Sequence, residues 1–133
     1  MWWISGFLTL YCNFELSANL IAGAFGSDQY VRIFRHYFTV GFNITYLPLI
    51  KVIAYTIGLN YYERKNHERV DITAQALHEA SNLCDFFDKY PPQSNKNAEY
   101  EIWREFVYST SSRNEVRLRY FEKLIDKLKN LNQ

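Results

Sequence analysis

Residues 2–25, WWISGFLTLYCNFELSANLIAGAF, contain no proline, and Glu15 is their single charged residue. A run of this composition is most simply one helix, and roughly 20 apolar residues suffice to cross the hydrocarbon core of a bilayer. Its small and weakly polar residues recur at spacings of three and four, which places them on one stripe of a helix. They are Ser5, Thr9, Cys12, Glu15, Asn19, Ala22 and Gly26.

Small residues on this stripe indicate how the predicted helix would pack. Ala18, Ala22 and Gly26 follow one another at four-residue spacing, which allows another helix to approach closely. A helix on the surface of a soluble protein would instead carry Lys, Glu and Arg. Glu15 and Asn19 would need partners inside the protein, because polar groups are costly in lipid. We therefore expect a helix packed against other helices, with both of these polar residues buried.

A second apolar run follows at residues 37–59, YFTVGFNITYLPLIKVIAYTIGL. Ala54 and Gly58 again offer a small-residue packing face, and Lys51 is a third candidate for a buried polar group. Pro48 interrupts the run. It would kink one spanning helix or, in a soluble protein, occupy the first turn of a new helix, and the sequence leaves both alternatives open.

The distribution of charge separates the two halves of the chain. Only five of the 29 charged residues lie among the first 62 positions, and the rest lie among the last 71. Trp2 and Trp3 at one end of the uncharged half, with Tyr61 and Tyr62 at the other, resemble the aromatic belts of membrane interfaces. The net charge of the whole chain is +1, so no global basic field attracts nucleic acid.

The second half, residues 63–133, has the pattern of a soluble unit of three helices. The first helix has the apolar stripe Ile72, Ala76, Ala80, Leu83, Cys84 and Phe87. The second helix, near residues 98–108, has Tyr100, Trp103, Phe106 and Val107 on its inner face. The last helix opens with a capping-box match at Ser112 and Glu115. Its apolar face consists of Leu118, Phe121, Leu124, Ile125, Leu128 and Leu131.

No group of residues specifies a reaction. Glu63, His67 and Asp71 could share one helix face as metal ligands, but the bases between them are more typical of a solvated helix. Cys12 and Cys84 form no disulfide framework and no zinc-ligand pair, which favours two small buried residues. The sequence therefore predicts no catalytic residue, no cofactor and no metal.

These observations predict an all-α protein with a membrane-embedded helical hairpin at residues 1–62 and a soluble helical unit at residues 63–133. We expect a non-catalytic accessory subunit of a larger membrane assembly, with its C-terminal half on the cytoplasmic or matrix-like side. Its partners would be protein subunits and lipid, with neither nucleic acid nor a small-molecule substrate. The alternatives are a cytoplasmic all-helical interaction module that buries residues 1–62, and a small pore-forming, holin-like membrane protein.

Overall fold

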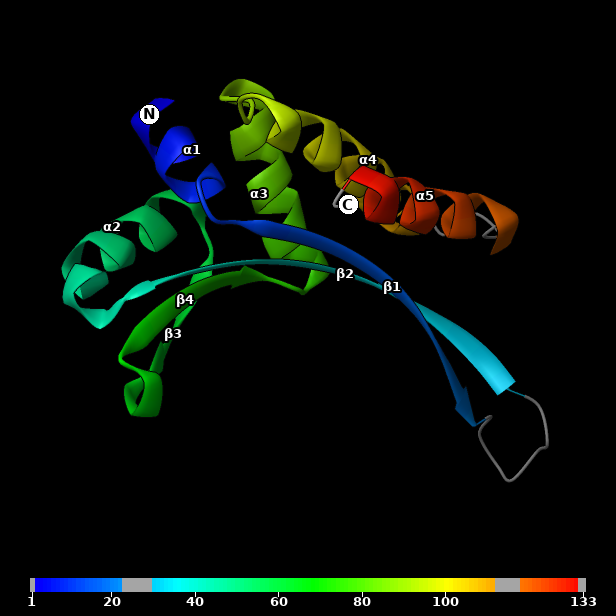
Figure 1. Ribbon diagram of the computed structural model, residues 1–133, viewed down its shortest axis with the longest axis horizontal. Coiled ribbons are helices and arrows are strands. Elements are labelled where there is room, and N and C mark those ends of the chain that lie inside the picture. Colours follow the sequence, from blue (N-terminus) through cyan, green and yellow to red (C-terminus); the bar gives the residue numbers. More distant parts are fainter. Residues whose placement is uncertain (1, 23–29, 112–117, 132–133) are drawn as a thin grey trace.

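The computed structural model describes residues 2–22, 30–111 and 118–131, and it shows one antiparallel sheet with helices packed on its convex side (Figure 1). Short 3-10 turns at Ile44–Tyr46 and Lys65–His67 precede α2 and β4. Along the chain the helices and strands are α1 (Trp2–Thr9), β1 (Asn13–Ala22), β2 (Tyr30–Asn43), α2 (Leu47–Ile57), β3 (Asn60–Arg64), β4 (Arg69–Ala74), α3 (Leu77–Lys89), α4 (Asn95–Ser111) and α5 (Leu118–Leu131).

The sheet has the strand order β1-β2-β4-β3, with every neighbouring pair antiparallel. Two hairpins, β1–β2 and β3–β4, are joined where β2 pairs with β4. In the register of the sheet, Phe14 lies opposite Phe38, and Val40 lies opposite Ile72. Apolar side chains from three strands therefore meet on one face of the sheet.

Alternation of apolar and polar residues explains why β1 and β2 are strands. Phe14 and Leu16 are buried, whereas Asn13 and Glu15 beside them are exposed. This two-residue period places one set of side chains on each face of a sheet, and aromatic and β-branched residues like those of β2 fit such a surface well. A sheet with one face packed on the core and the other face polar is typical of antiparallel strands.

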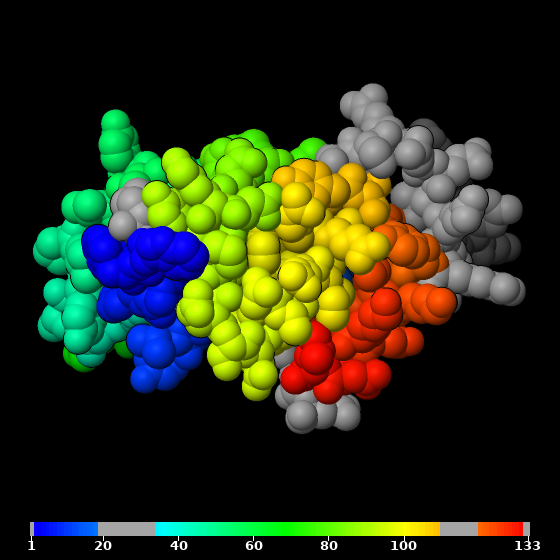
Figure 2. Space-filling view, turned by 90° about the horizontal axis from the view of Figure 1, so that it is seen from above, coloured from blue at the N-terminus to red at the C-terminus, as the bar shows by residue number. Residues whose placement is uncertain are grey.

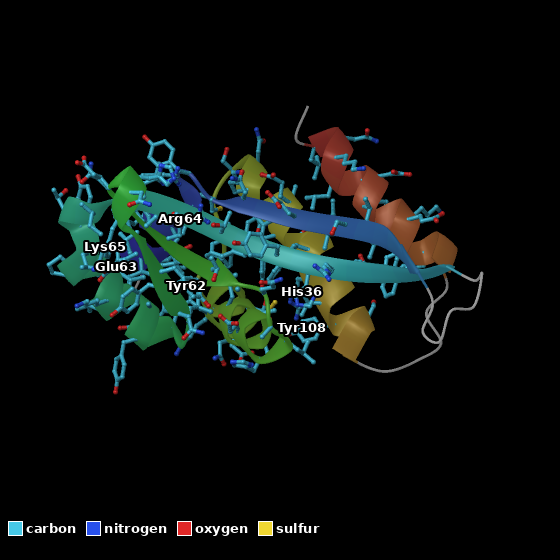
Figure 3. All side chains as sticks on the ribbon, turned by 90° about the horizontal axis from the view of Figure 1, so that it is seen from below. His36, Tyr62, Glu63, Arg64, Lys65 and Tyr108 are labelled. Carbon is cyan, nitrogen blue, oxygen red and sulfur yellow. The ribbon has the colours of Figure 1, made fainter. Side chains whose placement is uncertain are left out.

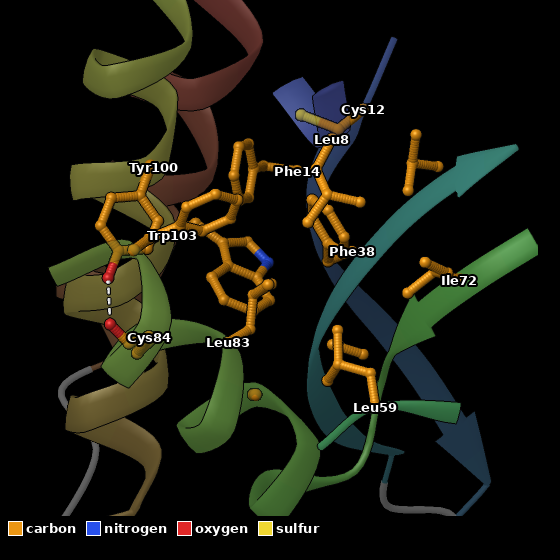
Figure 4. Close-up of a cluster of buried hydrophobic side chains, with 14 of the residues drawn as sticks. Leu8, Cys12, Phe14, Phe38, Leu59, Ile72, Leu83, Cys84, Tyr100 and Trp103 are labelled. Atoms are coloured by element: carbon orange, nitrogen blue, oxygen red, sulfur yellow. Dashed lines mark hydrogen bonds between the residues drawn. The ribbon is translucent and has the colours of Figure 1, made fainter. Parts of the chain in front are cut away.

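The helices bury the apolar face of the sheet. Trp103 of α4 packs 5.5 Å from Phe14 and 6.5 Å from Phe38, measured between ring centroids (Figure 4). The hydroxyl of Tyr100 lies 3.0 Å from the carbonyl oxygen of Cys84 and joins α4 to α3. Seen from above, the side chains of α1, α3, α4 and α5 cover most of this surface, and α2 lies at the end beside α1 (Figure 2). The core is therefore a layer between one sheet face and the helices.

Helix α2 begins and ends at residues suited to those positions. Pro48 lies in its first turn, where the missing N–H would have no partner in the helix and the fixed φ of proline fits the helix. Gly58 ends the helix with a φ of 85°, a left-handed conformation that favours glycine. Pro48 thus starts a new helix, the second of the two alternatives that the sequence leaves open.

Helix α1 is tied to the segment between α3 and α4. The hydroxyl of Ser5 donates to the carbonyl oxygen of Tyr90 at 2.8 Å. The ammonium group of Lys96 donates to the carbonyl oxygen of Cys12 at 2.9 Å and pairs with Glu99 at 3.1 Å. These contacts fix the N-terminal helix and the start of β1 against residues far along the chain.

The prediction of an all-α fold is wrong. Residues 2–25 do not form one helix: α1 ends at Thr9, and Asn13–Ala22 is strand β1. The second apolar run is divided between β2 and α2. Among the described residues, no helix is long and apolar enough to cross a bilayer, so the structure contradicts the predicted membrane hairpin. The eight residues of α1 span only about 12 Å, well short of the 30 Å of a hydrocarbon core.

The helices of the second half lie close to their predicted positions. Leu83 of α3, Trp103 of α4 and Leu124 of α5 are buried, as their spacing predicts. The first predicted stripe begins too early, because Ile72 belongs to β4 and α3 starts only at Leu77. The capping box at residues 112–115 lies outside the described residues. The proposed domain boundary after residue 62 falls inside β3, and β2 pairs with β4 across it.

Candidate functional site

The side of the sheet opposite the helices is lined mainly by polar side chains (Figure 3). Strand residues alternate between the two faces, so the neighbours of Phe14, Phe38 and Ile72 point away from the core. We call this side the open face. Among the strand residues whose side chains the structure describes, it consists of Asn13, Glu15 and Ser17 of β1, Arg35, Tyr37, Thr39, Gly41 and Asn43 of β2, Asn60, Tyr62 and Arg64 of β3, and Arg69, Asp71 and Thr73 of β4.

The register of the sheet arranges these side chains in rows. Asn13, Thr39, Thr73 and Asn60 lie side by side across all four strands. Directly opposed side chains on neighbouring antiparallel strands have Cβ atoms about 5 Å apart. The row therefore places amides and hydroxyls, which both donate and accept hydrogen bonds, side by side across the sheet. Thr73 is buried within the row, and the Asn60 amide donates to Oε2 of Glu79 at 3.4 Å.

A second feature of the open face is a carboxylate that two arginines share. Asp71 is buried, and its Oδ2 lies 2.6 Å from Nε of Arg64. Its Oδ1 lies 3.5 Å from Nη2 of Arg69. Gly41 is the residue directly opposite Asp71 on β2. The two arginines, called the arginine pair below, have side chains that are more than half exposed, whereas the carboxylate that they share is buried.

The three residues considered as metal ligands are not brought together. Asp71 contacts the arginine pair, Glu63 belongs to β3, and His67 lies in the exposed turn before β4. No helix carries them, because residues 63–71 form a hairpin. Within the described part of the chain, no three His, Cys, Asp or Glu side chains gather in a way that could hold a metal ion.

Residues predicted to line the packing stripe of the first helix lie instead along β1 or beyond it. Glu15 and Ala18 are exposed on the strand, and Glu15 belongs to the open face. Asn19 and Ala22 lie in the last part of β1. Gly26 is outside the described residues. A stripe at helical spacing does not form there, because strand geometry places side chains at a period of two.

The other predicted packing and polar residues lie in or at the end of α2. Ala54 is buried in the core and faces the sheet. Gly58 caps the helix, and its carbonyl oxygen accepts a hydrogen bond from the Asn82 amide at 2.9 Å. Lys51 is exposed on the outer side of the helix. Of the predicted site residues whose side chains the structure describes, Glu15 belongs to the open face.

Titratable groups inside the core have shifted pKa values. Burial raises the pKa of the Cys12 thiol to about 12 and that of Cys84 to about 11, so neither is a nucleophile at neutral pH. Both cysteines are buried, as expected from the sequence. Burial also lowers the pKa of His36, whose ring lies 5.9 Å from Trp103 on the helix side of β2.

Large apolar side chains are exposed at the start of α1 and just after its end. Leu10 and Tyr11 are 67% and 73% exposed, and Trp2 and Trp3 are each more than half exposed. We call these four residues the α1 patch. Large apolar groups left in water near one element are typical of a surface that another protein covers.

A two-residue alternation of polar and apolar residues in the sequence indicates the open face, but the low charge of the same segments favoured a membrane helix. Residues 13–17, NFELS, alternate strictly between polar and apolar, which indicates a half-buried strand. Residues 37–40, YFTV, continue this period in the second apolar run. The low charge of both runs favoured lipid, although a polar face made of Asn, Ser, Thr and Tyr needs few charges.

Comparisons with known proteins agree on one family. The model of the family described as LAGLIDADG endonuclease matches residues 11–107. A search of curated protein sequences finds no match. The fold is shared with the I-LtrWI LAGLIDADG homing endonuclease bound to target DNA, with a TM-score of 0.72 and 20% identity over 97% of this chain and 41% of that one. It is also shared with I-SmaMI bound to cleaved DNA, with a TM-score of 0.72 and 16% identity over 96% of this chain and 42% of that one.

These findings correct the predicted function. A non-catalytic accessory subunit of a membrane assembly is wrong, because the matching family consists of endonucleases. The exclusion of an enzyme and of nucleic acid as a partner is wrong for the same reason, and the structures with this fold hold DNA. The membrane location rested on spanning helices that the described residues do not form. The family match covers most of the chain and includes all four strands, so the protein belongs to the LAGLIDADG endonuclease family.

Proposed function

We propose that the open face binds duplex DNA and that this domain is one of two units of a DNA endonuclease. The observation that carries the proposal is the chemistry of the open face, where arginine, amide and hydroxyl side chains project from one side of a packed sheet. Arg, Asn, Ser, Thr and Tyr side chains are the usual donors to phosphate oxygens and base edges.

The dimensions of the sheet also support DNA binding. Strand β2 has 14 residues and so extends for about 46 Å, more than one turn of B-DNA at roughly 34 Å. Two-stranded β-ribbons enter the major groove, which is about 12 Å wide. The β1–β2 hairpin can therefore follow a groove over several base pairs, with the polar row Asn13, Thr39, Thr73 and Asn60 crossing the same face.

Two observations support a second unit. The chain spans about two fifths of the length of the DNA-bound structures that share its fold. The α1 patch leaves large apolar side chains in water, and each would contribute about 1.5–3 kcal/mol if a partner covered it. We propose that a second unit of the same family covers the α1 patch, so that two open faces bind one DNA duplex.

Cleavage of DNA raises the question of a metal ion. Nucleases commonly use divalent cations that carboxylates hold together with substrate phosphates. On the open face the carboxylates are Glu15, which is exposed, and Asp71, whose two oxygens contact the arginine pair. Neither belongs to a group of ligands within the described residues. The described side chains therefore do not fit a complete metal site.

The letters of the family name, compared with this sequence, also indicate that carboxylates for a metal ion are missing. Read as residues, LAGLIDADG has Asp at its sixth and eighth positions. Residues 4–12, ISGFLTLYC, align with it on Gly6, and Thr9 and Tyr11 stand at the two Asp positions. The end of α1 thus offers no carboxylate. No cleavage step is assigned to a metal held by this unit alone, and we propose that the second unit supplies the carboxylates.

The proposal is tested by selecting duplexes from a randomised DNA library with the purified chain and measuring Kd by fluorescence anisotropy at several salt concentrations. Arg35→Ala should weaken binding by about 1–3 kcal/mol, because Arg35 is an exposed cation of the open face. The matched control is Lys127→Ala, which removes a cation exposed on the outer side of α5 and should leave Kd unchanged. No binding at low salt, or equal effects of the two variants, would contradict the proposal.

A further inference from the structure

The shared carboxylate of Asp71 is an unusual group to find on a surface that binds DNA. A carboxylate repels phosphates, yet Asp71 lies on the inner strand β4, in the middle of the open face. Its side chain is 5% exposed, against 58% for Arg64 and 56% for Arg69. The buried acid therefore lies beneath two guanidinium groups that remain accessible to a ligand.

The opposite strand leaves space for this arrangement. A Cβ atom added at Gly41 would lie 1.8 Å from Nη2 of Arg69 and 2.6 Å from Oδ1 of Asp71. Among the described glycines only Gly58 has a positive φ, so the backbone conformation of Gly41 does not itself require glycine. The residue at position 41 instead leaves room for the side chains of Arg69 and Asp71. Any larger residue would displace the contact between them.

The contacts also determine which atoms remain available for a ligand. Arg64 approaches Asp71 through Nε, so its two Nη groups stay outside that contact. Arg69 approaches through Nη2, which leaves its Nε and Nη1. A guanidinium group has five N–H donors, and two parallel donors match O6 and N7 of guanine in the major groove. Holding the side chains in place before binding reduces the entropy lost when they bind.

We propose that Asp71 is a positioning residue that fixes the arginine pair to read guanine in DNA bound to the open face. The inference rests on the proposed function and deepens it. The net charge of Arg64, Arg69 and Asp71 favours binding to a base edge over binding to a phosphate. The carboxylate cancels one of the two positive charges, and the single remaining positive charge suits the neutral acceptor atoms of a base better than the anionic phosphates of the DNA backbone.

The test uses the preferred duplex from the library selection and competitors in which one base pair at a time is changed. Asp71→Asn keeps the size of the side chain and removes its charge. It should reduce discrimination at one or two adjacent guanine positions by at least about tenfold. Arg64→Gln and Arg69→Gln should lose discrimination at the same positions, and the control Lys127→Ala should leave discrimination at those positions unchanged.

A second variant keeps the test decisive if Asp71→Asn fails to fold. Gly41→Ala retains all three charged groups and displaces them, so it should lose the same guanine preference. Thermal unfolding of each variant separates a loss of fold from a loss of positioning. Unchanged base preference in both variants would overturn the inference, as would equal weakening on every sequence with an altered salt dependence, which would indicate phosphate contacts. Failure of the wild-type chain to bind any duplex would instead overturn the proposed function.

Discussion

The two faces of strand β2 differ more in the polarity of their side chains than the two halves of the sequence do. On the helix side, Phe38 and Val40 are fully buried and pack against the core. On the open face, Tyr37, Thr39 and Arg35 alternate with them and present polar groups. The difference shows that a segment with few charges is not necessarily surrounded by lipid. It can be a strand that buries one face and offers uncharged hydrogen-bonding groups on the other.

The largest expected effect is a difference in the free energy of unfolding between substitutions on the two faces of β2. Phe38→Ala removes a fully buried ring from the centre of the core, and we expect a loss of about 3–5 kcal/mol in the free energy of unfolding. Arg35→Ala on the same strand should change it by less than about 0.5 kcal/mol. Urea denaturation followed by circular dichroism measures both. Comparable losses for the two variants would mean that the open face also belongs to the core.

A smaller effect should distinguish the α1 patch from the open face. Leu10→Glu places a charge among exposed apolar groups and should weaken association with a second unit by about 1.5–3 kcal/mol, without unfolding the domain. Analytical ultracentrifugation over a range of concentrations measures the association of the chain with itself. Val52→Glu is the matched control, because Val52 is an exposed apolar residue on α2.

The outcome of that experiment also identifies the second unit. Self-association that Leu10→Glu reduces and Val52→Glu does not would make the second unit another copy of this chain. A wild-type chain that stays monomeric at high concentration would exclude a second copy, and the partner would then be a unit of different sequence. Such a partner could carry the acidic residues that Thr9 and Tyr11 replace here.

The smallest effect concerns a titratable group on the buried face of β2. Burial lowers the pKa of His36 from 6.5, so the folded state prefers the neutral ring. The unfolded chain binds the proton more readily, and stability should therefore decrease as the pH falls below about 6.5, until the pH lies below the folded pKa. His36→Phe should reduce this dependence between pH 7 and 5. Urea denaturation at each pH provides the measurement, and identical pH profiles for the two proteins would rule out this role for His36.

The helices could be predicted from the sequence better than the sheet. The residues Leu83, Trp103 and Leu124 are buried at the spacings that identify α3, α4 and α5. Strand β1 was not predicted, because Phe14 and Leu16 also fit a helical apolar run and the low charge of that run favoured a membrane helix over a strand. Pairing of β2 with β4 joins residues 26 to 36 positions apart, and no local pattern reports such a contact.

The candidate site was missed for a related physical reason. Asp71 was considered as a metal ligand on a helix face with Glu63 and His67, but it lies on a strand between arginines. The arginine pair forms only when the β3–β4 hairpin brings Arg64 opposite Arg69. Glycine at position 41 has a role that becomes visible only when the opposing side chains are in place.

The hydrogen bond between Ser5 and Tyr90 has a consequence for the order of folding. It joins residues 85 positions apart, so α1 cannot dock until the end of α3 has been synthesised. At roughly 5–20 residues per second, the nascent chain waits for several seconds with Ile4 and Leu8, which are buried in the folded structure, still exposed. During that interval the apolar side chains of the N-terminal segment can contact other chains, and a chaperone that binds short apolar segments would protect it.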